Sequence, residues 1–488
     1  MSRTAVRFLR NGVATELREV GANETLLDYL RLREHARGTK EGCSEGDCGA
    51  CTVAIGSLKN GKLVYEPVNA CIQLLGQIDG KDIVTVDDLG TVDALHPIQQ
   101  SMVEEHASQC GYCTPGIVMS LFVLYHSGER ADRDNVNNWL SGNLCRCTGY
   151  RPIADAAAKV IDGKPDDALA ARLVQTAELL AQMDDKVDLF VGTGERFFSA
   201  PASMASLLEM SAENPDAVIL SGATDVGLWI TKQLRDLPKI IYTGRVSGFR
   251  DIEDGDQRVR INAGATYQDA HHVLRSIDPD LGEVVRRIGS KPVRASGTVG
   301  GNIANGSPIG DMPPALIVLG TKLELRHGQS TREIDLEDFF IDYGKQDRAR
   351  GELVTALTIP RMTANQHFRA FKISKRFDQD ISCVLAAFCF TLHDDIITNV
   401  RIAYGGMAAT PKRASGAEKA LIGMHLGDQD RIEIAIAELS GDFTPMSDMR
   451  ASAKYRDRVA GNLLRKALYE IEAGETKATR LLALREAV

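Results

Sequence analysis

The chain has 488 residues, enough for about three or four domains of ordinary size. Its hydrophobic fraction of 44% and charged fraction of 25% are typical of globular proteins, which excludes the disordered and fibrous classes. The net charge of −9 argues against a general nucleic-acid or anionic-membrane surface, and no apolar run is long enough for a membrane helix. The N-terminal stretch has neither the apolar core nor the cleavage site of a signal peptide, so we expect a cytoplasmic protein.

Residues 1–86 have the pattern of a small β-grasp ferredoxin domain. Residues 5–20 predict a hairpin, because Asn11-Gly12 is preferred in type I′ turns. A short helix begins near Thr25, and residues 38–49 are rich in Gly, Ser and acidic residues, which is typical of a loop. Further strands are expected at residues 51–55, 64–71 and 83–86.

Eight of the ten cysteines lie before residue 148, in two groups of four. The first quartet is Cys43, Cys48, Cys51 and Cys71, and the second quartet is Cys110, Cys113, Cys145 and Cys147. Cytoplasmic cysteine groups are more often metal ligands or catalysts than disulfides. The C-x4-C-x2-C…C spacing of the first quartet is that of a plant-type [2Fe–2S] cluster. Zinc sites prefer C-x2-C pairs at both ends, so the zinc alternative fits this quartet poorly.

Residues 87–165 predict a four-helix domain that holds the second quartet. Apolar residues recur at helical spacing over residues 97–107, 116–127, 134–144 and 150–160. Each cysteine pair then lies at a helix end, where a small bundle brings the two pairs together. A Cys-x2-Cys pair with a distant Cys-x-Cys also suits zinc, so spacing alone leaves both metals open here. Two clusters in one chain would form a path for single electrons.

The second half changes to alternating strands, helices and glycine-rich turns. Residues 166–190 have no tight pattern and are expected to link the halves. An α+β domain is predicted over 191–365, and a C-terminal α+β domain over 366–488. Within the last domain, we expect the apolar neighbours Cys383 and Cys389 to face a core.

Two glycine-rich segments are candidate binding loops. One runs from Ser221 to Gly227 after a predicted strand, and the other is a long loop over 293–311. Neither has a Walker or G-x-G-x-x-G pattern, so a Rossmann site is not supported. Their composition suits backbone N–H groups that cradle a pyrophosphate, although ordinary turn glycine is favoured for either loop taken alone. His271 and His272 lie in a predicted polar helix and are expected to be solvated. No catalytic triad, metal-binding histidine pair or nucleophile elbow stands out, so the chain contains carriers and no site for bond chemistry on a substrate.

Several of these segments resemble a known family, the molybdenum hydroxylases. Residues 38–53, 109–116 and 143–153 resemble its two iron–sulfur modules. Residues 221–227, 297–314 and 402–414 look like the flavin domain of xanthine dehydrogenases. The resemblance covers nearly the whole chain. The sequence is most similar to the small subunits of bacterial xanthine dehydrogenases. In these, both cluster domains and a PCMH-type FAD domain share one chain, whereas relatives of the carbon monoxide dehydrogenase type keep them on separate chains.

The resemblance implies specific site residues. Each cysteine quartet would ligate one [2Fe–2S] cluster. The implied FAD-binding residues are Leu220, Ser221, Gly222, Ala223, Thr224, Asp225, Val226, Thr298, Gly301, Asn302, Ser307, Asp311 and Lys372. Asp380 closes the loop that follows Lys372, and residues 342–344 resemble the region that lines a nicotinamide pocket. Ile288 stands where relatives often carry an aromatic residue, a departure that bears on how the flavin is stacked.

The resemblance also implies a function. A molybdopterin-binding large subunit would oxidise hypoxanthine and xanthine to urate, and this chain would pass the electrons through two clusters to FAD and on to NAD+. The implied assembly is a dimer of heterodimers, with no nucleic acid, no membrane and no catalytic residue on this chain. The alternatives are the small subunit of an aldehyde or N-heterocycle hydroxylase, a self-contained iron–sulfur flavoprotein reductase, and a zinc-stabilised scaffold. The sequence leaves NAD+ and dioxygen open as final acceptor.

Overall fold

The computed structural model describes residues 2–161, 163–474 and 479. The N-terminal part is a five-stranded sheet in the order β2-β1-β5-β3-β4, which agrees with the predicted β-grasp fold. Its strands are β1 Val6–Arg10, β2 Val13–Leu17, β3 Thr52–Lys59, β4 Lys62–Asn69 and β5 Asp82–Val84. Asn11 and Gly12 have φ of 52° and 80°, as a type I′ hairpin turn requires. Thr25 caps helix α1 (Leu26–Asp28), and a π-helical turn follows over Tyr29–Arg33.

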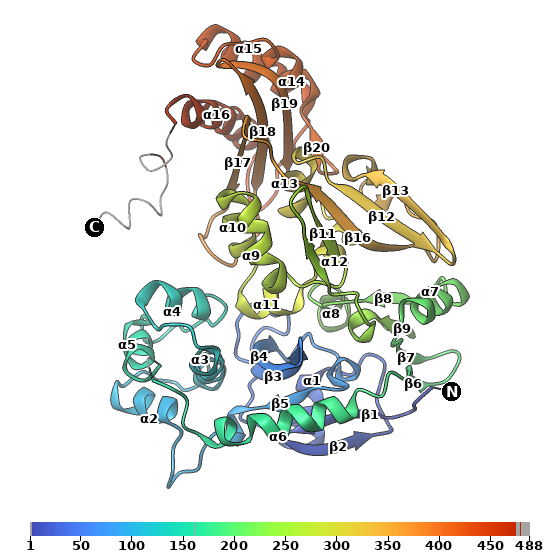
Figure 1. Cartoon of the computed structure of the whole chain (residues 1–488). Coiled ribbons are helices and arrows are strands. Elements are labelled where there is room, and N and C mark those ends of the chain that lie inside the picture. Colours follow the sequence, from blue (N-terminus) through green and yellow to red (C-terminus); the bar gives the residue numbers. More distant parts are fainter. Residues whose placement is uncertain (1, 162, 475–478, 480–488) are drawn as a thin grey trace.

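The predicted four-helix domain lies beside this sheet (Figure 1). Its helices are α2 Pro97–Glu104, α3 Thr114–Ser127, α4 Arg133–Leu140 and α5 Arg151–Val160. Helix α3 is apolar on all sides, and residues 116–125 are all buried because it is the central helix of the bundle. Ala54, Tyr65 and Val84 of the sheet belong to the same hydrophobic core as α3. The two N-terminal domains are therefore packed as one body.

The segment expected only to link the two halves contains a helix, α6 (Ala168–Met183), which packs along β1, β3 and β4 (Figure 1). Few of its side chains are buried, which explains why no clear apolar period marked it. Asp167 caps the helix and accepts a hydrogen bond from the Ala170 N–H at 2.7 Å. The other oxygen, Oδ2, lies 2.8 Å from Nε2 of both His96 and His126. This buried carboxylate thus joins α6 to α2 and α3.

Residues 189–474, called the flavin half below after their predicted cofactor, contain two larger sheets ahead of the C-terminal domain. The first has the order β6-β7-β9-β8, with strands β6 Leu189–Gly192, β7 Phe197–Ala200, β8 Val218–Leu220 and β9 Lys239–Tyr242, and it carries helices α7 Met204–Glu213 and α8 Val226–Thr231. The second has the order β10-β11-β16-β12-β13, with strands β10 Ile252–Asp254, β11 Arg258–Asn262, β12 Lys322–His327, β13 Ser330–Asp335 and β16 Leu353–Pro360. A small hairpin, β14 Phe340–Asp342 and β15 Lys345–Gln346, follows β13.

Residues 293–311 are not the long loop that their composition predicted. The helices of this half are α9 Tyr267–Ile277, α10 Pro279–Arg286, α11 Lys291–Ser296, α12 Val299–Asn305 and α13 Met312–Val318. Thr298 caps α12 by accepting the Gly301 N–H at 3.1 Å. A Cβ at Gly300 would lie 2.3 Å from the Cβ of Ala263, so this glycine lets α12 pack closely on the turn that follows β11. Tertiary packing therefore overrides the low helix propensity of the segment.

The C-terminal domain is an antiparallel sheet covered by helices, as predicted. It comprises β17 Gln366–Ile373, β18 Val384–His393, β19 Ile396–Gly405, β20 Lys412–Arg413, α14 Ser415–Leu421, α15 Gln429–Asp442 and α16 Ala453–Glu472. Cys383 and Cys389 are buried, as expected. His272 is exposed, but the prediction for His271 was wrong, because its Nε2 lies 3.1 Å from the carbonyl of Gly282 on α10 and burial lowers its pKa.

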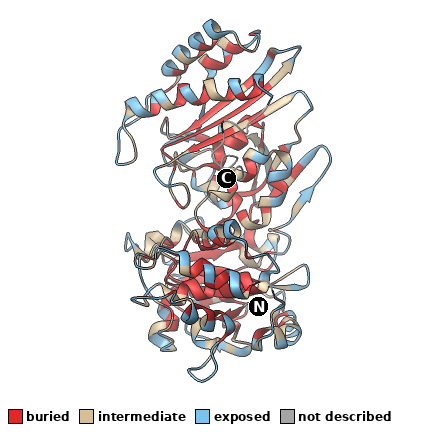
Figure 2. Ribbon diagram, turned by 90° about the vertical axis from the view of Figure 1, so that its left-hand side faces the viewer, coloured by how far each residue is buried: buried red, intermediate tan, exposed pale blue. Residues whose placement is uncertain are grey.

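Buried residues concentrate in the sheets and on the inward sides of the helices (Figure 2). One core joins the ferredoxin sheet to the first flavin sheet, because Phe8 and Cys71 share it with Phe198, Leu220 and Ala223. Shared cores of this kind fix the two sheets relative to one another. Among the described helices, none has both the length and the apolar character needed to cross a bilayer.

Candidate functional site

The first quartet gathers at the edge of the ferredoxin sheet. Cys43 and Cys48 are half-buried in the loop of residues 38–49, while Cys51 and Cys71 are buried beside β3 and β4. The thiols of Cys48 and Cys71 donate to the sulfur of Cys43, which lowers the pKa of Cys43 and raises theirs. Cys71 also contacts Cys51. Neighbouring contacts therefore connect all four sulfurs, from Cys48 through Cys43 and Cys71 to Cys51.

Backbone geometry supports this arrangement. Gly46 and Gly49 have φ of 75° and 70°, a region that favours glycine. The amide N–H groups of Asp47 and Cys48 donate to the sulfur of Cys43 at 3.4 and 3.3 Å. Such N–H···S contacts stabilise thiolate charge and tune the potential of a bound cluster.

The second quartet lies at the ends of α3 and α4. Cys113 immediately precedes α3 and contacts Cys145. Burial is the main reason why the pKa of Cys113 is raised to about 12, and the neighbouring Cys145 raises it further. Cys147 contacts Cys110 and both are exposed, whereas Cys145 is buried. This quartet thus has one pair of thiols toward the protein and one pair toward solvent.

The spacing of the sulfurs separates a binuclear cluster from a single zinc ion. With Zn–S bonds of 2.3 Å, four thiolates on one tetrahedral zinc lie about 3.8 Å from each other. Among the described residues, the only group of three or more candidate ligand atoms that all lie within 4.8 Å of one another is His96, His126 and Asp167. In the described part of the chain, no three thiols of either quartet therefore lie as close together as one zinc ion requires, and this wider spacing suits two iron atoms better than one zinc.

The histidine and aspartate group is a hydrogen-bond junction and suits a metal poorly. The Ile98 N–H donates to Nδ1 of His96 at 3.2 Å, so Nδ1 is the acceptor and Nε2 carries the proton that faces Asp167. A metal on Nε2 would require the opposite tautomer.

A direct hydrogen bond connects the two quartets. The Leu144 N–H, next to Cys145, donates to the carbonyl of Cys48 at 2.9 Å. A Cβ at Gly116 of α3 would lie only 2.0 Å from the carbonyl oxygen of Gly49, so the helix and the first cysteine loop are in close contact. One backbone hydrogen bond thus connects Cys48 of the first quartet to the residue next to Cys145 of the second.

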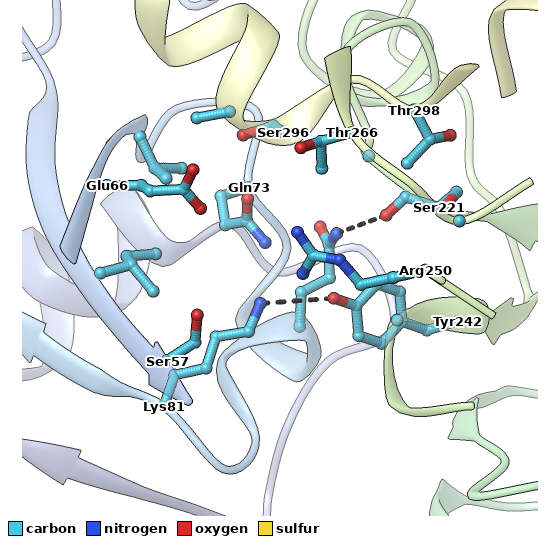
Figure 3. Close-up of a pocket in the computed structure, with 17 residues that line it drawn as sticks. Ser57, Glu66, Gln73, Lys81, Ser221, Tyr242, Arg250, Thr266, Ser296 and Thr298 are labelled. Atoms are coloured by element: carbon cyan, nitrogen blue, oxygen red, sulfur yellow. Dashed lines mark hydrogen bonds between the residues drawn. The ribbon is translucent and has the colours of Figure 1, made fainter. Parts of the chain in front are cut away.

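The two predicted flavin loops lie against each other. The first loop covers residues 221–225, between β8 and α8. A Cβ at Gly222 would lie 2.1 Å from the carbonyl oxygen of Ser296, and one at Gly297 would lie 3.4 Å from Oγ1 of Thr224. Gln77 of the ferredoxin domain donates to the carbonyl of Ser221 at 3.1 Å. Behind this loop is a polar cavity between the two domains, which Figure 3 shows with Arg250 and Lys81 among its lining residues.

The remaining predicted flavin residues lie on α12, in the turn between α12 and α13, and on β17. Asp311 is buried, and Nζ of Lys372 donates to its Oδ2 at 2.5 Å. The Ser382 hydroxyl donates to the other oxygen, Oδ1, at 2.5 Å. Asn302 has a buried Oδ1 atom without a hydrogen-bond partner. Ser307 lies in the turn between α12 and α13, where its hydroxyl accepts the Ile309 N–H. The Oδ1 atom of Asn302 lies on the glycine-containing helix that Thr298 caps. A bound dinucleotide such as FAD fits this site, because its polar atoms would supply the hydrogen bond that Oδ1 lacks.

Protein-family models match both the two cysteine quartets and the predicted flavin residues. Four family models match in succession: a 2Fe-2S iron-sulfur cluster binding domain at residues 10–72, a [2Fe-2S] binding domain at 85–158, the FAD binding domain in molybdopterin dehydrogenase at 193–362, and the CO dehydrogenase flavoprotein C-terminal domain at 369–471. The chain belongs to the molybdenum hydroxylase family.

Named relatives within this family include xanthine dehydrogenases. The chain is 31% identical to xanthine dehydrogenase of Emericella nidulans over 503 residues, covering 90% of this chain and 36% of that protein. It is 29% identical to xanthine dehydrogenase/oxidase of Mus musculus, covering 85% and 36%. The chain thus spans little more than a third of the length of these relatives.

Two solved structures share the fold. CO dehydrogenase from Oligotropha carboxidovorans aligns with a TM-score of 0.53 and 27% identity over 58% of this chain and 98% of that chain. Quinoline 2-oxidoreductase from Pseudomonas putida 86 aligns with a TM-score of 0.52 and 22% identity over 56% and 96%, which shows a common fold.

Sequence reasoning missed the residues that join the first quartet to the flavin half. Thr231 of α8 donates to the carbonyl of Ser44 at 2.6 Å, and the Gln379 side chain donates to the carbonyl of Asp47. These partners are 187 and 332 residues apart, and no local pattern marks either of them. Arg287 was missed as well: its guanidinium lies 4.5 Å above the ring of Phe377.

The other predicted positions lie at the periphery of the flavin residues. Ile288 is half-buried and packs on the core of the flavin half. Asp380 accepts the Arg376 N–H at 2.8 Å and so closes its own loop. Residues 342–344 form the exposed turn between β14 and β15, and Gln346 ties this hairpin to the end of α12 through the carbonyl of Asn305.

Proposed function

We propose that the chain is the electron-transfer subunit of a molybdenum hydroxylase, with Cys43, Cys48, Cys51 and Cys71 as ligands of one [2Fe–2S] cluster and Cys110, Cys113, Cys145 and Cys147 as ligands of the other. The observation that carries the proposal is the order of the contacts. The second quartet is partly exposed, it touches the first through Leu144 and Cys48, and the first touches the flavin half through Ser44 and Asp47. Electrons would enter at Cys110 and Cys147 and leave at FAD.

Each part of the chain has a distinct task in this proposal. The cysteine loops hold iron with paired thiols and place N–H donors on the sulfurs. The first flavin loop, the start of α12 and the Asp311–Lys372 pair hold and orient FAD, which when bound converts one-electron into two-electron chemistry. The proposal keeps the domain boundaries expected from the sequence, with clusters within 1–86 and 87–165 and flavin domains at 191–365 and 366–488, while the expected linker at 166–190 contains helix α6.

We further propose xanthine or hypoxanthine as the substrate and NAD+ as the acceptor. Relatives named xanthine dehydrogenase that match over most of this chain support the purine assignment. The substrate would bind a molybdopterin-containing partner in a dimer of heterodimers, which is supported by the chain covering only 36% of the Emericella nidulans xanthine dehydrogenase and matching only iron–sulfur and flavin domain models. CO dehydrogenase and quinoline 2-oxidoreductase share the fold, so an aldehyde or N-heterocycle substrate is the alternative.

Co-expression with the candidate molybdenum subunit tests the proposal. The wild-type complex should form NADH from NAD+ with xanthine. In the complex carrying Cys147→Ala, xanthine should still reduce molybdenum while NADH formation stops. Undiminished NADH formation would contradict the order of transfer, and full reductase activity of the isolated chain on a substrate of its own would favour a self-contained enzyme.

A further inference from the structure

Asn143 has a fully buried side chain between the two quartets. It is only 1% exposed, and its polar neighbours Ser120 and Thr52 are 0% and 1% exposed. Its Nδ2 donates to the carbonyl of Gly49 at 3.2 Å and to Oγ1 of Thr52 at 3.3 Å. Its Oδ1 accepts the Ser120 hydroxyl at 2.7 Å. Both polar atoms of the Asn143 amide are therefore hydrogen-bonded, Nδ2 to the segment around Cys51 and Oδ1 to helix α3.

These partners are immediate neighbours of the cysteines. Gly49 lies between Cys48 and Cys51, and Thr52 follows Cys51 directly. Ser120 is on α3, the helix that begins after Cys113, and Asn143 itself comes two residues before Cys145. A single side chain thus holds the backbone of both cysteine loops and the helix behind them.

The chemistry at this position suits asparagine well. The site needs a side chain that donates twice and accepts once, and a carboxylate could not donate. An apolar side chain would leave the Ser120 hydroxyl without its acceptor in a buried site, at a cost of about 1–3 kcal/mol. The carbonyl of Gly49 also accepts from the N–H and the hydroxyl of Thr52, at 3.1 and 2.7 Å, so the amide completes a closed network.

The neighbouring backbone depends on this network. The Leu144 N–H that donates to the carbonyl of Cys48 belongs to the residue after Asn143. If the amide of Asn143 no longer holds Gly49, the hydrogen bond between the quartets loses its nearest support. The two loops could then shift without unfolding either domain, because the core that the sheet shares with α3 does not include Asn143.

We propose that Asn143 is a positioning residue that sets the distance and orientation between the two clusters. The inference rests on the proposed function in that it assumes a cluster at each quartet. Removing the side chain would leave each cluster intact but weaken the coupling between them. Electron transfer between the clusters should slow by on the order of tenfold, because small misplacements of reacting groups have large effects on rate.

The test compares Asn143→Ala and Ser120→Ala with Ser101→Ala in the full chain. Ser101 is the matched control, because its buried hydroxyl donates to the carbonyl of Ala156 at 2.9 Å in the same domain but away from the cysteine loops. Three properties are measured for each variant: iron and acid-labile sulfide content, the magnetic interaction between the two reduced clusters by EPR, and hydrogen exchange at the Leu144 amide.

The expected result is wild-type iron in all three variants. Asn143→Ala and Ser120→Ala should show a weakened magnetic interaction and about three- to tenfold faster exchange at Leu144, because its one hydrogen bond to the carbonyl of Cys48 is weakened. Ser101→Ala should show neither change. Wild-type coupling and wild-type exchange in Asn143→Ala would overturn the inference. A wild-type chain without iron would instead refute the proposed function, and the exchange at Leu144 would still report on Asn143.

Discussion

Two glycines beside the cysteines allow a sharp test of how closely the quartets are packed. Gly49 and Gly111 have φ of 70° and 83°, so alanine at either position should cost about 1–2 kcal/mol in left-handed backbone strain. Their surroundings differ. A Cβ at Gly49 would lie 2.2 Å from the carbonyl oxygen of Gly142, whereas a Cβ at Gly111 meets nothing within 4 Å. Overpacking at Gly49 should add about 1–3 kcal/mol of destabilisation.

The assay is urea unfolding followed by the visible absorbance of the clusters, combined with EPR of the reduced protein. Gly49→Ala should unfold at a lower urea concentration than Gly111→Ala, and it should also weaken the magnetic interaction between the clusters by moving the second cysteine loop away. Gly111→Ala should keep that interaction. Equal stability and equal coupling in the two variants would refute the close contact between the loops.

Three further predictions concern the flavin site and the α6 junction. Lys372→Met should destabilise the protein by about 3–5 kcal/mol, because it leaves the Asp311 carboxylate buried without its cation, and adding Asp311→Asn should restore part of the loss in a denaturation experiment. Asn302→Ala should lower FAD content while the FAD-free chain unfolds as wild type; unchanged FAD content would argue against Asn302 as a ligand. Burial opposes ionisation of Asp167, but hydrogen bonds from two histidines outweigh it and lower its pKa, so its stabilisation is present above about pH 4 and lost as the pH falls. Asp167→Asn should therefore reduce stability at neutral pH and flatten this acid dependence in unfolding midpoints measured against pH.

The N-terminal half was predictable because its elements follow local rules. The Asn11-Gly12 turn and the apolar periods of α2 to α5 each depend on residues close in the sequence, and the structure confirms them. Helix α6 was missed because most of its surface is exposed, so its apolar stripe is narrow.

The flavin half was harder to predict, for two physical reasons. Residues 293–311 read as a loop by composition, yet close packing of Gly300 on Ala263 makes them partly helical. The contacts of Thr231 and Gln379 with the first cysteine loop join distant parts of the chain, and only the folded structure brings them together. Local patterns thus located the carriers, but the links between them depend on tertiary structure.

We expect both quartets to hold binuclear iron clusters in one electron path. EPR of the dithionite-reduced full chain, together with iron and acid-labile sulfide analysis, tests it most directly. We expect about four iron atoms and two distinct [2Fe–2S] signals per chain, with one signal absent in Cys147→Ala. Zinc in place of iron, or a single signal that survives Cys147→Ala unchanged, would contradict it.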